Sequence, residues 1–206
     1  MAEICHTARP DEYTARAPPS CKTPWVQTQS GIPSLEHLLA LPPKVTLSLV
    51  LSLDGQLCGP DGSSRSISGP EDLEWLRRLR AASDAVVVGA ATAAAEGYRD
   101  IRIRPEFAPA RAAAGMAEHP QLVILHRSDI FSEVLQEVGS RVLLEAGIRL
   151  HTVLASHIDR VWISHAPVLV GDQQAGFALP FDDFVLTERW VGEVFVFSCF
   201  ERVSPR

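Results

Sequence analysis

The sequence contains no apolar run long enough to cross a membrane, and its N-terminal region has no apolar core of the kind that signal peptides carry. The four cysteines, Cys5, Cys21, Cys58 and Cys199, are scattered and form no CxxC pair. This usage is typical of reduced thiols in a cytosolic protein rather than of a disulfide framework. We therefore expect a cytoplasmic protein without a membrane partner.

Metal-binding patterns are also missing. Cys5, His6 and Cys21 match no standard zinc spacing, and the remaining histidines form neither HExxH nor a Cys/His cluster. We therefore expect no bound metal.

Three nucleotide and nucleophile fingerprints are absent: GxGxxG, GxxxxGK[ST] and GxSxG. The first two absences exclude the standard dinucleotide and nucleoside-triphosphate loops, and the third weakens a hydrolase interpretation. A nucleotide bound by this chain would therefore be held by another fold.

Positive charge is scarce, since 19 Lys and Arg stand against 25 Asp and Glu and give a formal net charge of −6. A nucleic acid or an anionic membrane would select a basic surface, so neither is expected as the main partner. The 206 residues are 46% hydrophobic and 21% charged, which is enough apolar material for one globular core without disulfides.

A strand over residues 45–53 is predicted by strict alternation of apolar and more polar residues. Its apolar positions are Val45, Leu47, Leu49, Leu51 and Leu53. Asp54-Gly55 ends the strand at a turn signal, which leaves a carboxylate beside a backbone that can take positive φ. Strand ends of this kind carry active-site residues in α/β enzymes, although an Asp-Gly pair is also an ordinary turn.

The residues before this strand form a lead-in. Residues 1–33 are rich in Pro, Thr, Ala and charge, which predicts an irregular arm. Ser34 is a predicted cap for a short helix over residues 35–41, which Pro42-Pro43 ends. We therefore divide the chain into an N-terminal arm with a short helix, residues 1–43, and a domain over residues 44–206.

Strands and helices alternate after the first strand, which predicts a parallel sheet with helices on its faces. A helix begins near Pro70, with Ser68 as its hydroxyl cap and a buried side formed by Leu73, Leu76 and Leu79. Further strands are predicted over residues 85–89, 122–125, 141–144 and 161–164, and further helices after Ser128 or Asp129 and over residues 148–156.

The C-terminal region differs from this alternation. Residues 184–191 and 194–203 are two β-rich runs separated by Gly192-Glu193, which predicts an antiparallel hairpin. The predicted fold class is therefore α/β: an open, mostly parallel sheet flanked by helices, with an antiparallel C-terminal hairpin.

The turns after three predicted strands bring together residues suited to a nucleotide, because the carboxyl ends of parallel strands meet at one edge. Gly89 and Thr92 lie in the first turn, Arg127 and Ser128 in the second, and Gly147 in the third. Thr92 offers a hydroxyl to a phosphate, Gly147 lets backbone amides approach a pyrophosphate, and Arg127 with Ser128 suits the 2′-phosphate of NADP.

These residues also have ordinary structural explanations. Gly147 suits a helix-entry turn, Thr92 and Ser128 suit helix caps, and Arg127 suits a solvated surface charge.

Six short motifs follow one another along the chain: SLDG at 52–55, SGPE at 68–71, LR at 79–80, DAVVVGAAT at 84–92, LLEAG at 143–147 and APVLVG at 166–171. In this order they resemble the pyrimidine reductase family of riboflavin biosynthesis, over about residues 45–203. The resemblance implies the fold of dihydrofolate reductase and a homodimer. It also implies NADPH-dependent reduction of a ribosylaminopyrimidine 5′-phosphate, whose ribose becomes a ribityl chain.

The zinc deaminase domain that bacterial members of that family often carry upstream has an HxE and PCxxC signature. This signature is absent from the sequence, so we expect a stand-alone reductase-type domain.

The resemblance also implies roles for individual residues. The residues matching cofactor contacts are Leu51, Thr92 and the run 147–153, which includes Gly147, Ile148, Arg149 and Leu150. The residues matching substrate contacts are Ser64, Arg80 and Glu145, with Arg102 or Arg104 facing the substrate phosphate. Asp54 and Glu145 are the candidate catalytic carboxylates for the proton step.

Three departures from the family pattern bear on the substrate. Ser48 stands where the family commonly has Lys, Glu96 stands where it usually has Asp, and the sequence 145–148 is EAGI where many members have EGG or EAGP. A dihydrofolate or dihydropterin reductase therefore stays open as an alternative, as does a catalytically silent NADP-binding protein.

Overall fold

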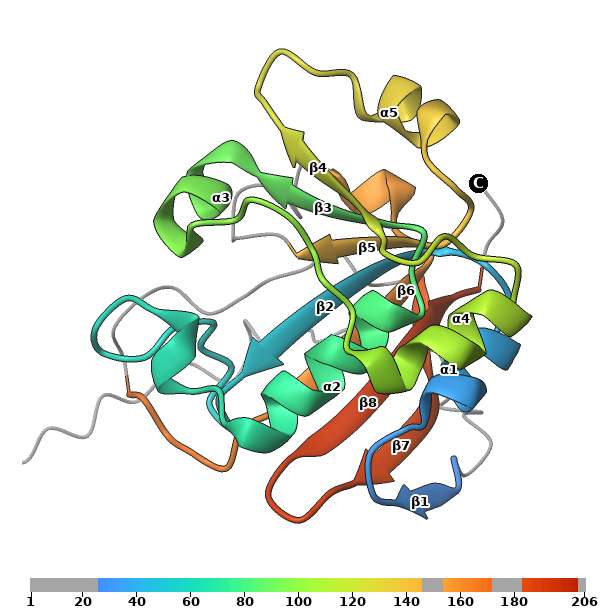
Figure 1. Ribbon diagram of the computed structural model, residues 1–206. Helices are drawn as coiled ribbons and strands as arrows, with labels where there is room; N and C mark the ends of the chain where they lie inside the picture. Colours follow the sequence, from blue (N-terminus) through green and yellow to red (C-terminus); the bar gives the residue numbers. More distant parts are fainter. Residues whose placement is uncertain (1–25, 146–153, 172–182, 204–206) are drawn as a thin grey trace, which may run out of the picture.

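The computed structural model describes residues 26–145, 154–171 and 183–203, which form a sheet of eight strands covered by helices (Figure 1). The strands are β1 (Thr28–Ser30), β2 (Val45–Leu51), β3 (Ala85–Gly89), β4 (Gln121–Leu125), β5 (Val142–Glu145), β6 (Arg160–His165), β7 (Phe184–Val191) and β8 (Val196–Arg202). The helices are α1 (Leu35–Ala40), α2 (Pro70–Ala81), α3 (Ala90–Glu96), α4 (Ala108–Ala113) and α5 (Phe131–Glu137), with 3-10 turns η1 (Ser64–Ser66), η2 (Pro105–Phe107) and η3 (Ala155–His157). None of the described helices is long and apolar enough to cross a membrane.

The strand order is β1-β7-β8-β6-β2-β5-β3-β4. The neighbours from β6 to β4 are parallel, whereas β8 runs antiparallel to both β6 and β7. This arrangement confirms the predicted open, mostly parallel sheet with an antiparallel C-terminal hairpin. The alternation of strands and helices is typical of a parallel sheet, because two parallel neighbours need a long crossover connection that is usually a helix.

Strand β2 lies at the centre of the parallel region, between β6 and β5. Leu47 is fully buried, and Val45, Leu49 and Leu51 are also buried on the same face. The predicted extension of this strand to Leu53 is wrong, since that side chain is 64% exposed. The chain leaves the sheet at Ser52 and turns through Gly55, whose φ of 78° a residue with a side chain rarely adopts.

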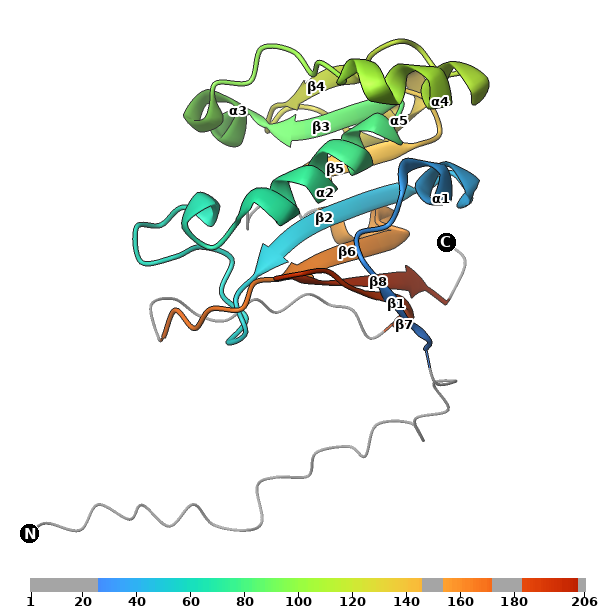
Figure 2. The same ribbon diagram turned by 60° about the horizontal axis from the view of Figure 1, so that its bottom comes forward.

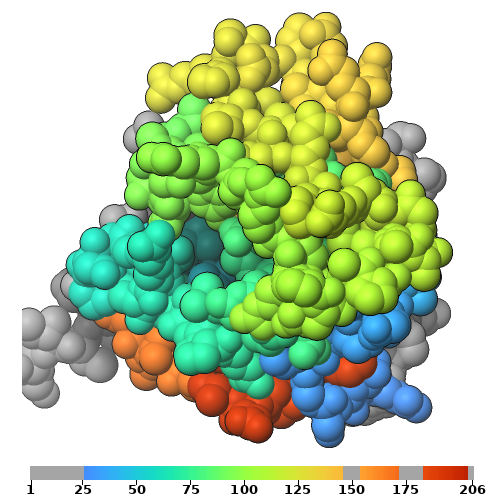
Figure 3. Space-filling view, in the orientation of Figure 1, coloured from blue at the N-terminus to red at the C-terminus, as the bar shows by residue number. Residues whose placement is uncertain are grey.

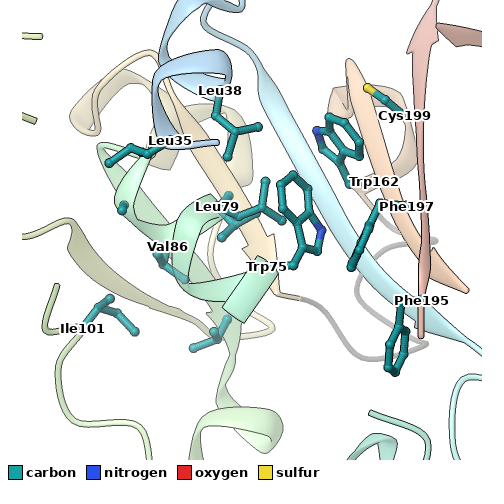
Figure 4. Close-up of a cluster of buried hydrophobic side chains, with 14 of the residues drawn as sticks. Leu35, Leu38, Trp75, Leu79, Val86, Ile101, Trp162, Phe195, Phe197 and Cys199 are labelled. Atoms are coloured by element: carbon teal, nitrogen blue, oxygen red, sulfur yellow. The ribbon is translucent and has the colours of Figure 1, made fainter. Parts of the chain in front are cut away.

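The sheet has a hydrophobic core on each face. One face is covered by α1 and α2, which lie across it in Figure 2. Here the Trp75 ring packs edge-on against Trp162 with centroids 4.8 Å apart, and Phe197 lies 5.5 Å from Trp75 (Figure 4). The opposite face packs against Phe131 of α5 and Leu154 and Ile158 around η3. Burial of these large side chains supplies the main driving force for the fold.

Helix α2 differs from its prediction at the cap and on its buried side. Pro70 occupies the first helical position as expected, but the N-cap is Gly69, and the Ser68 hydroxyl instead donates to Asp72. Leu73 is 45% exposed, so it was wrongly assigned to the core. The residues facing the sheet are Asp72, Trp75 and Leu79, which are spaced three and four positions apart. The buried side of the helix therefore begins at Asp72, one residue before the predicted Leu73.

The lead-in is more ordered than predicted over its described part. Residues 28–30 form the edge strand β1 beside β7, where an irregular arm was expected. Ser34 caps α1 as predicted, by accepting from the backbone N–H of His37. The Arg141 guanidinium donates to three carbonyls at the end of the same helix, those of Leu38, Leu39 and Leu41. The described lead-in is therefore tied into the same fold as the rest.

Other boundaries also differ. Strand β4 begins one residue before the predicted range 122–125 and lies at the sheet edge, where only Leu125 is buried. Helix α5 begins after Ile130, because Asp129 accepts from His126 instead of capping the helix, and the Ser128 hydroxyl points to Asp129. The predicted helix over 148–156 lies largely outside the described residues, and its described end continues into the 3-10 turn η3.

The Glu71 carboxylate fixes the start of α2 to the β7–β8 turn. It accepts hydrogen bonds from three consecutive backbone N–H groups, those of Glu193, Val194 and Phe195, at 2.7, 2.9 and 2.7 Å. A Cβ on Gly192 would come within 2.1 Å of a Glu71 carboxylate oxygen. Glycine is therefore needed at this turn for the close approach.

Replacing Glu71 tests this contact. We expect Glu71→Ala to lower the free energy of unfolding by about 1–2 kcal/mol, because three amides lose a charged acceptor. The matched control is Glu133→Ala on the exposed first turn of α5, measured by the same denaturant titration. Equal stability of the two variants would show that the three hydrogen bonds to Glu71 do not stabilise the fold.

Candidate active site

The carboxyl ends of the parallel strands meet at one edge of the sheet, as expected (Figure 1). Gly89 pairs in register with Leu125, and Val88 pairs with Glu145. The turns after β3 and β4 and the last residue of β5 therefore lie side by side. The structure brings together the strand ends that the sequence assigned to nucleotide binding.

A hollow opens on the α2 face of the sheet near this edge. Figure 3 shows it between the teal residues, which include the loop after β2 and the start of α2, and the green residues of α3 and the segment that follows. Ser48 and Val50 are half-exposed although β2 is paired on both sides. Side chains in a central strand are exposed only where no helix covers the sheet, so the helices leave this part of the face open at these two residues.

Arg80, Glu145 and Tyr98 form a connected cluster on this face. The Arg80 guanidinium donates from Nε and Nη2 to the two Glu145 carboxylate oxygens, at 2.6 and 2.5 Å. Its Nη2 also donates to the Tyr98 hydroxyl at 2.6 Å, and that hydroxyl donates to Glu145 Oε2 at 2.5 Å. The Glu145 side chain is only 9% exposed. Such a two-point pair fixes the plane of the carboxylate as well as its position.

The cluster has a defined protonation state. Burial and the negative charge of Glu145 raise the pKa of Tyr98, so its hydroxyl remains a proton-bearing donor at neutral pH. Burial alone would lower the pKa of Arg80, but the Glu145 carboxylate outweighs this effect and raises it. The hollow therefore offers an aligned cation, carboxylate and phenol to a polar ligand.

The family resemblance implied Arg80 and Glu145 as substrate contacts, and the structure brings them into direct contact with each other. Leu144 of β5 pairs with Leu47 of β2. The next residues along these two parallel strands are Glu145 and Ser48, so the two lie on neighbouring strands at the same level. Tyr98 was missed. It follows Gly97, which ends α3 with a φ of 70°, and a single tyrosine after a helix end carries no pattern that predicts this contact.

Asp54 is held as an anchor of the neighbouring loop. Its carboxylate accepts from the Ser52 hydroxyl at 2.5 Å and from the backbone N–H groups of Gly171 at 2.7 Å and Val170 at 3.1 Å. These hydrogen bonds, that of Ser52 foremost, lower the pKa of Asp54 to about 2. A carboxyl that has lost its proton at neutral pH is a poor proton donor, so the geometry favours the anchor over the proton relay.

The other predicted substrate residues lie around the rim. Ser64 begins η1 and is exposed, and its neighbour Arg65 forms an ion pair with Glu96 of α3, which joins the two walls of the hollow. Arg102 pairs with Asp100 at 2.7 Å, and Arg104 pairs with Glu74 at 3.0 Å and with Glu106 at 3.4 Å. Both guanidiniums are thus engaged by carboxylates, and the contacts do not select one over the other.

The predicted cofactor residues fall into two groups. Leu51 ends β2, Gly89 is the N-cap of α3, and Thr92 lies half-buried in its first turn. Arg127 and Ser128 are exposed in the turn after β4. A guanidinium and two hydroxyls at adjoining strand ends suit a phosphorylated dinucleotide. The residues Gly147, Ile148, Arg149 and Leu150 lie outside the described part of the chain.

Metal ligation finds no support in the described ranges, where no group of three His, Cys, Asp or Glu side chains is arranged around a common point. Cys5, His6 and Cys21 lie outside these ranges.

Known proteins resemble this chain in sequence and in fold. A family model, the RibD C-terminal domain, matches residues 43–136. A riboflavin biosynthesis protein RibD from Mycobacterium tuberculosis is 31% identical over 148 residues, which cover 63% of this chain and 43% of that protein. The chain therefore spans less than half the length of this relative.

Two solved structures show the likeness of fold. A pyrimidine reductase-like protein from Corynebacterium diphtheriae has a TM-score of 0.68 at 17% identity, over 84% of this chain and 100% of that one. Dihydrofolate reductase from Enterococcus faecalis, complexed with NADP(H), has a TM-score of 0.56 at 12% identity, over 79% of this chain and 98% of that one. The fold is that of dihydrofolate reductase, as the resemblance implied.

The anchoring of Asp54 predicts a pH dependence. A folded-state pKa below the ordinary value of 3.8 means that the stabilisation is complete above about pH 4 and is lost as the pH falls through about 2. We expect Asp54→Asn to lower the melting temperature at neutral pH, and the difference from wild type to shrink over this acid range. The control is Glu133→Gln. A difference between wild type and Asp54→Asn that does not change with pH would contradict the anchoring role.

Proposed function

We propose that this chain, whose residues 43–136 match the family model of the RibD C-terminal domain, is a member of that family and an NADPH-dependent pyrimidine reductase of riboflavin biosynthesis. The observation that carries the proposal is the Arg80–Glu145–Tyr98 cluster in the hollow. The matched family segment includes β2, α2 and α3, the elements that border this hollow.

The substrate we propose is a ribosylaminopyrimidine 5′-phosphate. The pyrimidine carries amino and carbonyl groups, and the paired Arg80 and Glu145 bring a cationic donor and an anionic acceptor to one place. Tyr98 limits the rotation of the carboxylate by bridging the same two groups. These side chains therefore orient the substrate, which is the main task of a protein in a hydride-transfer reaction.

NADPH supplies the hydride when bound, and its carbon acceptor is C1′ of the opened sugar in its imine form. Leu51, Gly89 and Thr92 border the cofactor site at the strand ends, and Arg127 with Ser128 is the donor pair for the 2′-phosphate. The choice of NADPH over NADH rests on this pair, because a guanidinium binds a phosphate dianion through two hydrogen bonds.

We further propose that the protein is cytoplasmic and acts as a homodimer. The described cysteines, Cys58 and Cys199, are free thiols, which supports a reducing compartment. Val185 and Val191 on β7 are 40% and 43% exposed, and this strand has the short β1 as its outer neighbour. A second copy would cover such an edge. Scattering in solution measures the state directly, and a monomer at high concentration would contradict it.

The reaction is tested by following NADPH oxidation by absorbance with the ribosylaminopyrimidine 5′-phosphate and, in parallel, with dihydrofolate. We expect turnover of the pyrimidine and none of dihydrofolate. Turnover of dihydrofolate alone would overturn the substrate. If NADPH neither shifts the melting temperature nor is oxidised with either substrate, the chain is not a reductase.

The role of Glu145 is tested by Glu145→Gln. We expect kcat/KM to fall about 10- to 100-fold, because a charge-assisted hydrogen bond is lost and Arg80 is left without its partner. The NADPH-induced rise in melting temperature should persist, and Glu133→Gln should behave as wild type. Unchanged kcat/KM would remove Glu145 from the site.

A further inference from the structure

A small cavity lies at the end of the sheet opposite the hollow. The amino ends of β2, β5 and β6 line it through Thr46, Val142 and Arg160, whereas the hollow adjoins the carboxyl ends of the parallel strands. Leu38 of α1 and Leu79 of α2, labelled in Figure 4, line it from the helices that cover this face. The volume of the cavity is about 30 Å³, and its wall is mainly polar. The cavity is therefore separate from the candidate active site.

Three basic residues line this cavity, Lys44, Arg141 and Arg160, and no acidic residue of the described ranges does so. The Glu201 carboxylate pairs with two of them, with Arg160 at 2.7 Å and with Lys44 at 3.0 Å. The Arg141 side chain forms no ion pair with the described residues, and its acceptors are the uncharged backbone carbonyls at the end of α1. Cations taken out of water are usually paired with an anion, so one charge here lacks its counterpart.

Hydrogen-bond donors are also in excess around the cavity. A guanidinium has five N–H donors and an ammonium has three. Arg141 uses three of its donors on carbonyls, and Lys44 uses one on Glu201. Thr46 is only 9% exposed, and its hydroxyl has no partner among the described residues. A hydroxyl on a buried residue that lines a cavity and lacks a protein partner points to a ligand or a water at that place.

Charge separates the ligand from the water. Burial lowers the pKa of Arg141; the Asp84 carboxylate opposes this effect, and the positive charge of Arg160 adds to it. The two guanidiniums are therefore close enough to repel each other. A water molecule would accept from the spare donors and leave this repulsion in place, whereas an anion satisfies the donors and offsets the repulsion as well.

The size of the cavity limits the kind of anion. A volume of about 30 Å³ holds roughly one or two groups the size of a water molecule, each of which needs about 10–15 Å³. A chloride ion is only slightly larger than a water molecule. Sulfate and phosphate carry four oxygens around a central atom and do not fit. The cavity therefore suits a monatomic anion.

We propose that this cavity is a binding site for a monatomic anion of the chloride class, held by the Thr46 hydroxyl, the Lys44 ammonium and the Arg141 guanidinium. The Lys44 side chain is 25% exposed and marks the side from which the ion enters. Because Leu38 and Leu41 of α1 also line the cavity, the bound ion joins this helix to the sheet. The inference does not depend on the proposed function.

The melting temperature of the full chain tests the site. Sodium chloride replaces sodium gluconate at constant ionic strength, since gluconate is too large for the cavity. We expect a rise that saturates, of about 3–6 °C at ten times the Kd of chloride. Bromide should act as chloride does, and sulfate should give only the gradual rise of an excluded salt. A rise that does not saturate with chloride, or a saturating rise with sulfate, overturns the proposal.

Two substitutions locate the effect. Thr46→Val keeps the shape of the side chain and removes the hydroxyl, and Lys44→Gln removes the ammonium charge. Each should raise the chloride concentration at half-saturation about tenfold. The matched controls are Thr187→Val on the exposed face of β7 and Arg77→Gln on the exposed side of α2, which should keep the wild-type midpoint. A purely structural role predicts a lower melting temperature at every chloride concentration with an unchanged midpoint, and this result contradicts the proposal.

A crystal grown in sodium bromide gives a readout that requires no variant to fold. We expect an anomalous scattering peak inside the cavity, in contact with the Thr46 hydroxyl. A water molecule at that position overturns the site. A bromide peak without a saturating rise of the melting temperature in solution identifies an adventitious ion only, and it overturns the site equally.

Discussion

The ion pair between Arg80 and Glu145 is the interaction on which the arrangement of the site depends. It joins α2 to β5, and through Tyr98 it also fixes the segment that follows α3. Removing both charges from water costs several kcal/mol, which two short hydrogen bonds and the phenol offset only in part. A pair of this kind adds little to stability over a well-packed apolar pair. In this site the pair holds the Glu145 carboxylate in one orientation beside the hollow.

Two aspartates around the loop after β2 have opposite environments. Asp54 is exposed and accepts three hydrogen bonds, which hold it as a carboxylate that fastens residues 170–171. Asp72 is buried and accepts from the Ser68 hydroxyl, and its burial raises its pKa above the ordinary aspartate value. The two environments shift the pKa values of these carboxyl groups in opposite directions, although the residues look alike in the sequence.

Local signals explain how much could be predicted. The continuous apolar runs of β3, β5 and β6 and the β-rich composition of β7 and β8 identified these strands, because strand burial selects apolar, β-branched and aromatic residues. Strand β1 left no trace, since the residues TQS are polar and pair only at the sheet edge. The predicted cap of α2 was wrong because Ser68 has an alternative hydrogen-bond partner in the folded chain. Ser68 bonds Asp72, and Glu71 reaches a turn 122 residues away, which no local pattern records.

The central claim is that the hollow beside Arg80 and Glu145 binds the pyrimidine substrate. Tyr98→Phe tests it most directly, because it removes only the hydroxyl that bridges the two charged groups. The measurement is a calorimetric titration of the ribosylaminopyrimidine 5′-phosphate into each protein. We expect Kd to rise about tenfold in the variant, because one hydrogen bond in a buried network is lost. An unchanged Kd, with the fold intact, would show that the substrate does not bind at this cluster.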